Sequence, residues 1–149
     1  YDRVFEAERT VIRQSPNAEA ALLDGFRRYF EFLAEHPGFI RLVGQEQMSR
    51  TPRASEEIRG LADMGLGNLT PILAQGIRDG TFREDLDLRL VLASIASLCM
   101  GIFQRRSQLQ RLWDIDLDDA NTRERALQHL QTLFLIGVRP RSAREGGAQ

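Results

Sequence analysis

The sequence predicts an all-α domain of about six helices, packed orthogonally or as a bundle, and three observations lead to this fold class. Apolar residues recur at intervals of three and four along the chain, which is the period of a helix. No stretch alternates apolar and polar residues for the length of a strand. The 149 residues are 42% hydrophobic, a balance that suits one domain with one core.

The first two predicted helices meet at a proline. Residues 1–14 have a narrow apolar stripe, which is typical of a helix that connects two bodies, so we expect a linker helix there. The chain begins in helical pattern without an initiator Met, and we expect that a segment precedes it. The second helix begins at Ser15-Pro16-Asn17, because proline is tolerated in a first turn. It ends at His36-Pro37-Gly38, because the residue before a proline resists the helical region.

Two further helices are expected before residue 80. The third covers about 39–49, and the fourth runs from Thr51-Pro52 to about Asp79. Gly65, Gly67 and Pro71 predict a kink or break in the middle of the fourth helix. In the stretch AQGIRDGTFRED, residues 74–85, no Lys-Ser/Thr follows the glycines, so this is not a phosphate-binding loop. We expect Gly80 to end the fourth helix in a left-handed conformation, with Phe82 tucked back as the anchor of the turn.

The last two long helices follow this corner. The fifth is predicted over about 87–112, with Asp85 or Asp87 at its start, where the helix dipole favours an acidic residue. The sixth is predicted over about 121–137, where Asn121 and Glu124 resemble a capping box. Residues 15–138 would form the domain, and residues 139–149 read as a disordered tail.

The fifth helix has two faces without charge. One carries the core side chains Leu88, Leu92, Ala96, Cys99 and Phe103. The opposite face carries Leu90, Ser94, Ser97, Leu98 and Gly101, which are small or apolar where a solvated helix would be charged. This second face needs cover from another helix or a second subunit. The sixth helix also has apolar residues outside its main stripe, so a four-helix bundle with a symmetry mate is favoured over a monomer that buries both faces internally.

Several classes of chemistry find little support in the sequence. The net charge is −1, so no basic stripe for nucleic acid is evident. The single cysteine, Cys99, fits a reducing compartment, and the expected location is the cytoplasm without a membrane partner. His36 and His129 lie in different helices, and no metal-ligand spacing is present. We therefore expect no enzyme activity, no metal and no cofactor.

Ligand binding remains as a possibility that the residues support. Bulky and flexible side chains recur at helical spacing, which is also what a plain core requires. The predicted break in the fourth helix favours imperfect packing, and Glu46 could orient a ligand or simply pair with Arg41 or Arg50.

The chain resembles the C-terminal effector-binding and dimerisation domain of tetracycline-repressor (TetR) family transcription regulators. The resemblance covers nearly the whole chain and rests on "FRRYFEFLAEHPGFIRLVGQEQ" (26–47), "ILAQGIRDGTFREDLDLRLVLASIASLCMGIF" (72–103) and "HLQTLFLIGV" (129–138). It implies a homodimer through the last two long helices and a pocket enclosed by the second, fourth and fifth. It also implies that operator DNA is bound only by an N-terminal helix-turn-helix domain outside this chain.

The resemblance places candidate site residues on this sequence. The expected ligand pocket contains Phe26, Phe30, Phe39, Glu46, Met64, Met100, Phe103 and Gln104. The expected dimer interface contains Leu90, Ser94, Leu98, Gly101, Arg105, Leu127, Leu130 and Phe134. The resemblance implies the regulatory domain of a transcriptional repressor, which binds a small hydrophobic effector and thereby controls DNA binding. The alternative is a helical dimerisation or protein-interaction module with a filled core and no ligand.

Overall fold

The structure is a computed structural model, and it describes residues 17–48, 56 and 69–141. Every regular element within these ranges is a helix, which confirms the predicted all-α fold. Residues 69–78 form a helical segment. The other helices are α2 (Ala18–Glu35), α3 (Pro37–Met48), α5 (Leu88–Gln104), α6 (Arg106–Trp113) and α7 (Ala120–Val138).

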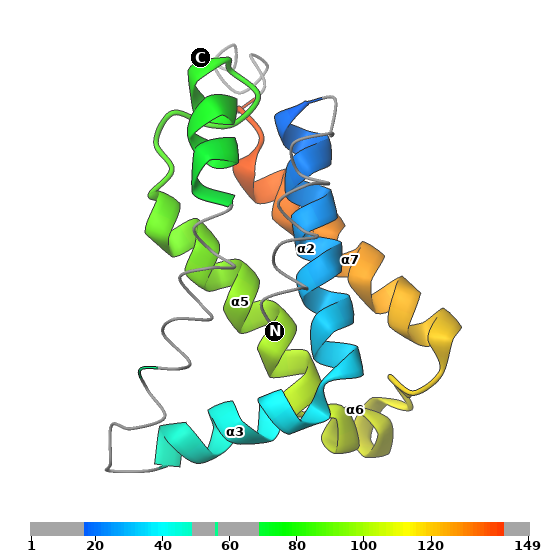
Figure 1. The fold of residues 1–149 in the computed structure, drawn as a ribbon. Helices are drawn as coiled ribbons and strands as arrows, with labels where there is room; N and C mark the ends of the chain where they lie inside the picture. The colour runs from blue at the N-terminus through cyan, green and yellow to red at the C-terminus, as the bar shows by residue number, and fades with distance from the viewer. Residues whose placement is uncertain (1–16, 49–55, 57–68, 142–149) are drawn as a thin grey trace, which may run out of the picture.

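Helix α2 is the central element of the described fold, because it contacts α3, α5 and α7. Figure 1 shows α2 and α5 running down the molecule together, α7 passing behind α2, and α3 lying across their lower ends. Helix α3 also contacts α5, so α3 and the end of α2 enclose one end of the core. This arrangement makes the α2–α5 pair the axis around which the apolar side chains gather.

The helices begin at side chains that accept a hydrogen bond from the first turn. Asn17 Oδ1 accepts from Ala20 N at 2.7 Å, so Asn17 is the cap of α2 and the helix begins after the proline that was expected in its first turn. Asp87 Oδ1 accepts from Arg89 N at 3.0 Å, and Asp87 is one of the two residues predicted at the start of α5. For α7 the prediction of an Asn121–Glu124 capping box was wrong. Asp119 is the cap, with its Oδ2 accepting from Thr122 N at 2.9 Å. Glu124 bonds to Arg27 of α2 instead, so it is not available to close a capping box.

The predicted fifth helix over 87–112 is broken in two. Arg105, at φ −101° and ψ 13°, both ends α5 and precedes α6, and the axes of the two helices differ by 67°. Helix α6 buries no residue and ends at Asp114, whose φ of 53° is left-handed. Uniform helical spacing across residue 105 concealed this bend, since Arg105 is neither glycine nor proline.

The corner between residues 76 and 82 follows the prediction for Gly80 and adds a role for Gly76. Gly80 has a φ of +82°, the left-handed conformation expected after a helix. Phe82 is buried, and its amide donates to the Gly76 carbonyl at 3.0 Å. A Cβ on Gly76 would lie 2.2 Å from Cδ2 of Phe82. The phenyl ring therefore occupies the space that a side chain at position 76 would need.

Some predicted features lie outside the described residues. They are the linker helix 1–14, the glycines of the expected kink at 65 and 67, Met64, and the part of the expected tail after residue 141. Within the described part, no single helix is long and apolar enough to cross a membrane, although the bent α5–α6 pair would qualify by length and composition together.

Candidate functional site

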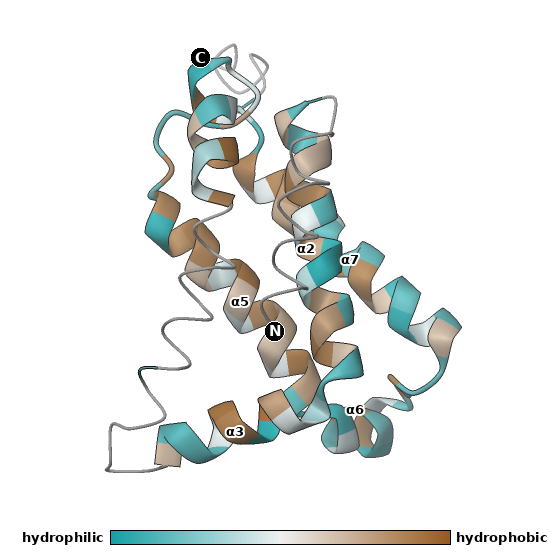
Figure 2. Ribbon diagram, in the orientation of Figure 1, coloured by the Kyte–Doolittle hydropathy of each residue, from teal (hydrophilic) through white to brown (hydrophobic). Residues whose placement is uncertain are grey.

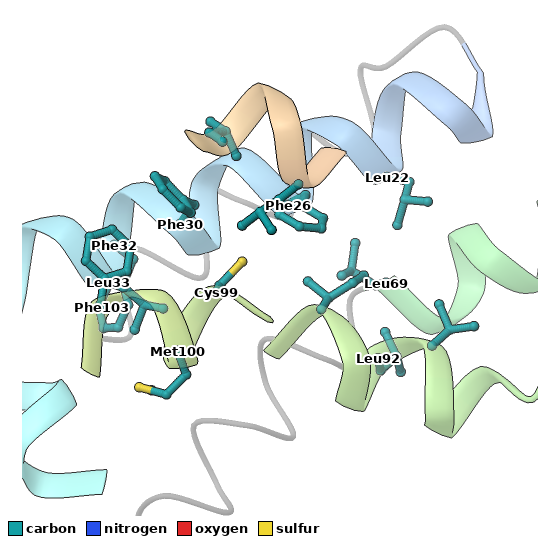
Figure 3. Packing of buried hydrophobic residues seen from close by; sticks show 14 of the residues in the cluster. Leu22, Phe26, Phe30, Phe32, Leu33, Leu69, Leu92, Cys99, Met100 and Phe103 are labelled. Atoms are coloured by element: carbon teal, nitrogen blue, oxygen red, sulfur yellow. The ribbon is translucent and has the colours of Figure 1, made fainter. Parts of the chain in front are cut away.

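The core between α2 and α5 is rich in aromatic side chains. The rings of Phe30 and Phe103 are tilted against each other with centroids 4.8 Å apart, and both side chains are buried. Phe26 meets Phe134 of α7 edge-on at 5.8 Å. Figure 3 shows Cys99 between α5 and α2 with its sulfur directed toward Phe26, and Met100 directed toward α3. The aromatic residues of α2 thus contact both long helices that follow.

Five of the eight predicted pocket residues lie in one apolar cluster. They are Phe26, Phe30, Phe39, Met100 and Phe103. Glu46 is partly buried on α3, and Gln104 is exposed at the last residue of α5. Met64 lies outside the described residues. The structure therefore brings the predicted apolar residues together, and it does not join Gln104 to them.

Phe32 is a core residue outside the stripe that helical spacing predicts for α2, which contains Leu22, Phe26, Tyr29 or Phe30, and Leu33. It is buried, stacks on His36 with centroids 4.3 Å apart, and meets Phe39 edge-on at 5.3 Å. Phe32 therefore extends the aromatic cluster around the α2–α3 corner. The signal in the sequence was the spacing of three residues from Phe26 to Tyr29 and from Tyr29 to Phe32, because residues three apart lie on one side of a helix.

Cys99 and Tyr29 bring weakly polar groups into this apolar core. Cys99 is fully buried, and burial raises the pKa of its thiol to about 12, so the thiol is protonated near neutral pH. Burial also raises the pKa of the Tyr29 phenol above its usual value, and the ionised forms of the two groups repel each other. Neither group has the depressed pKa of a nucleophile.

Apart from Arg89 near its start and Gln104 at its end, the exposed residues of α5 are apolar or small. Leu90 is 65% exposed and Leu98 is 40% exposed, while Ser94 and Arg105 are exposed and Gly101 is partly exposed. A Cβ added to Gly101 would meet no atom of the described residues within 4 Å, so none of them fills the space over that glycine. Figure 2 shows hydrophobic or intermediate colour over most of α5. This helix therefore has apolar surface both toward the core and away from it.

Helix α7 contributes different residues to the surface from those predicted. Leu127 and Leu130 are buried in the chain's own core, and Phe134 is partly buried against Phe26. Leu133 is 53% exposed and Ile136 is 68% exposed. The Arg83 amide donates to the Val138 carbonyl at 2.9 Å, which holds the end of α7 against the corner that leads into α5. We call Leu90, Ser94, Leu98, Gly101, Leu133 and Ile136 the α5–α7 surface.

Three polar contacts join α2 to α7. Arg27 donates two hydrogen bonds to Glu124, Gln131 Nε2 donates to the Leu23 carbonyl at 3.1 Å, and Arg139 donates two to Glu19. On α2 the partners follow each other at intervals of four residues, along one side of the helix. These contacts fix the position of α7 on α2, in addition to the Phe26–Phe134 contact.

The described residues contain no group of three or more His, Cys, Asp or Glu side chains that could hold a metal ion. The arrangement that they do contain is an aromatic core next to an uncovered apolar surface, in an all-helical domain. An exposed apolar surface of this kind is typical of an interaction site.

Comparisons with known proteins identify the family to which the chain belongs. The family model for the tetracycline repressor-like C-terminal domain matches residues 19–133, so the chain belongs to this family. The family consists of transcription regulators, and the chain is not an enzyme. It is also similar to the HTH-type transcriptional repressor NicS of Pseudomonas putida, with 27% identity over 141 residues. That alignment covers 93% of this chain and 66% of NicS. No solved structure gives a significant match.

Proposed function

We propose that this chain is the effector-binding and dimerisation domain of a bacterial transcriptional repressor. Two copies would associate through the α5–α7 surface, and a small hydrophobic effector would bind beside α2 and α5. The observation that carries the proposal is the uncharged face of α5, where Leu90 and Leu98 remain exposed in a single chain. Leu133 and Ile136 of α7 are also exposed, and exposed apolar side chains of this kind are typical of a protein interface.

Operator DNA would be bound by a helix-turn-helix domain that precedes the chain in the whole protein, which would act in the cytoplasm. NicS is described as an HTH-type repressor, and about a third of its length lies outside the alignment. The net charge of −1 is consistent with a domain that does not itself hold DNA. The effector would act by binding the conformation that does not fit the operator better than the one that does, because equal affinity for both shifts no equilibrium.

The contacts of α2 suggest how occupancy of the core would reach the dimer. Phe26 faces the core, and its ring also meets Phe134 of α7. Arg27, the next residue, is bonded to Glu124 of α7. A ligand that displaces α2 would therefore move α7, one of the two helices proposed to form the interface.

A second function is a dimerisation module without a ligand. The close contact of Phe30 with Phe103 favours it, because this part of the described core is already filled. Both proposed functions require a dimer, so the oligomeric state does not distinguish them. Binding of a small ligand does, because only the effector-binding domain requires it.

The experiment is a thermal-shift screen of the purified chain against drugs, fatty acids, acyl-thioesters and flavonoids. Under the effector proposal, at least one class raises Tm in a concentration-dependent way. The control is Met100→Ala, which enlarges the proposed site and should change the ranking of ligands. A chain that forms dimers but is stabilised by no compound supports the dimerisation module.

A further inference from the structure

The last turn of α7 meets two segments that are distant from it in the sequence. The carbonyls of Gly137 and Val138 accept hydrogen bonds from Arg83, at 3.4 Å from its Nη1 and at 2.9 Å from its amide. Arg139, the next residue, donates from Nε and Nη2 to the two carboxylate oxygens of Glu19, at 3.3 and 2.7 Å. Figure 1 shows the start of α2 and the end of α7 at the same end of the molecule. One turn of α7 therefore connects the corner before α5 to the first turn of α2.

These contacts supply hydrogen bonds that the end of a helix lacks. The last carbonyls of an α-helix have no partner within the helix. In α7, Arg83 provides two of the missing donors. The guanidinium of Arg83 also donates two hydrogen bonds to Asp85, which lies two residues before the cap of α5. The end of α7 is therefore held to the segment that leads into α5.

The same turn of α7 carries part of the α5–α7 surface. Ile136 is 68% exposed, whereas Val138, two residues later, is buried in the chain's own core. In a dimer formed through this surface, the partner would cover Ile136 and restrict the backbone of the last turn. Residues 137–139 would be restricted with it, and these residues make the bonds to Arg83 and Glu19.

The first turn of α2 lies outside the buried core. Residues 17–20 are all partly or fully exposed, and the first buried residue of the helix is Ala21. Asn17 caps the turn, and Arg139 holds Glu19 from the side of α7. Helix ends that are little buried open more readily than the core, so one contact changes how often they open.

We propose that the last turn of α7 couples the association of two copies to the order of the first turn of α2, with Arg139 as the positioning residue. Dimerisation restricts the turn at Ile136, and the bonds from Arg139 to Glu19 pass this restriction to α2. The inference rests on the proposed function, because it requires the dimer. Under that function a DNA-binding domain precedes the chain, and the first turn of α2 is the described helical turn nearest to it in the sequence.

The test is hydrogen exchange of the purified chain, measured at the backbone amides of residues 20–22. The wild type is compared with Leu98→Glu, which removes the dimer through α5 and leaves the sequence of α7 unchanged. Each of these two backgrounds is also combined with Arg139→Met. The control substitution is Arg78→Met, because Arg78 Nη2 donates to Gln75 within the helical segment 69–78. Light scattering gives the mass of every sample.

We expect the amides of residues 20–22 to exchange about 2-fold to 5-fold more slowly in the wild-type dimer than in Leu98→Glu, on the scale of one exposed ion pair. In Arg139→Met this difference between dimer and monomer should disappear, while the mass remains that of a dimer. Arg78→Met should keep the difference. The paired reversal, Arg139→Glu with Glu19→Arg, should restore it.

Two outcomes would overturn the inference and leave the dimer intact. If Arg139 only stabilises the turn, Arg139→Met speeds exchange equally in dimer and monomer, and the difference between them persists. Equal exchange in the wild-type dimer and the Leu98→Glu monomer would likewise show that association does not order α2. Dilution of the wild type to its monomer repeats the comparison without a substitution. A wild type that is monomeric at every concentration would contradict the proposed function itself, and the measured mass distinguishes this failure from the other two.

Discussion

The guanidinium of Arg27 donates two parallel hydrogen bonds to the carboxylate of Glu124, at 2.8 and 2.6 Å, across 97 residues of sequence. This paired geometry joins α2, which carries the aromatic core, to α7, which carries Leu133 and Ile136 on its surface. Two parallel bonds also fix the relative orientation of the groups, which a single ion pair does not. The contact therefore restricts how the two helices can move relative to each other.

Removing this contact should cost modest stability with a defined pH dependence. Both side chains are over a third exposed, so we expect a coupling of about 0.5–1 kcal/mol in a cycle of Arg27→Met and Glu124→Gln, measured by urea unfolding at pH 7. The hydrogen bonds from Arg27 lower the pKa of Glu124. The coupling should thus be complete above the ordinary carboxyl pKa and disappear as pH falls through the lower folded-state value. Glu31→Gln, which removes a single 3.4 Å contact within α2, should cost less.

Gly76 should be intolerant of a side chain. Gly76→Ala would force the buried Phe82 ring to move, and we expect a loss of about 1–3 kcal/mol in the free energy of unfolding. Gly44→Ala is the matched control, since a Cβ there would meet no atom of the described residues within 4 Å. The control should be neutral or stabilising by up to about 1 kcal/mol, because alanine favours helix more than glycine. Equal effects from both substitutions would mean that the Phe82 ring can move at no cost.

Gly80 should be replaceable only by residues that accept a left-handed backbone. Gly80→Val should destabilise the chain by about 1 kcal/mol or more, because the φ of +82° is strained for a β-branched residue. Gly80→Asn should cost clearly less, since asparagine adopts this region more readily. Urea unfolding of the two variants measures the difference, and the prediction fails if valine is tolerated as well as asparagine.

The Cys99 thiol should be unreactive in the folded protein. Burial raises its pKa to about 12, so the nucleophilic thiolate is rare at pH 8. We expect an aromatic disulfide reagent to modify the native chain only at the rate of unfolding and to react at once in denaturant. The raised pKa also predicts that stability declines as pH rises above the ordinary thiol value, since only the unfolded chain ionises there. Rapid native-state modification would show that Cys99 is accessible.

The sequence predicted well those features that depend on local spacing. The core face of α5, the left-handed Gly80 and the cap Asp87 follow from periodicity and from the preferences of single residues. The bend at Arg105 was missed because tertiary contacts, and no glycine or proline, determine it. The cap of α7 was misplaced because Glu124 has a distant partner in Arg27, which no local pattern reveals.

The sequence predicted only part of the candidate site, because helical spacing does not show how the helices pack against each other. Helical spacing identified Phe26, Phe30 and Phe103 as inward-facing, but it could not tell which apolar residues of α7 this chain buries for itself. Leu127 and Leu130 are covered by α2 and its neighbours, whereas Leu133 and Ile136 are left on the surface. That distinction depends on the angle at which α7 crosses α2.

Association through the α5–α7 surface is the central proposal, and size-exclusion chromatography with light scattering tests it most directly. Four proteins are compared at micromolar concentration: the wild type, Leu98→Glu, Ile136→Glu and the control Leu112→Glu. Leu112 lies on α6 and is about as exposed as Ile136. We expect a mass of about twice 17.0 kDa for the wild type and Leu112→Glu, and near 17.0 kDa for the other two. A wild-type mass of 17.0 kDa, or a dimer that tolerates both surface charges, would contradict the proposed interface.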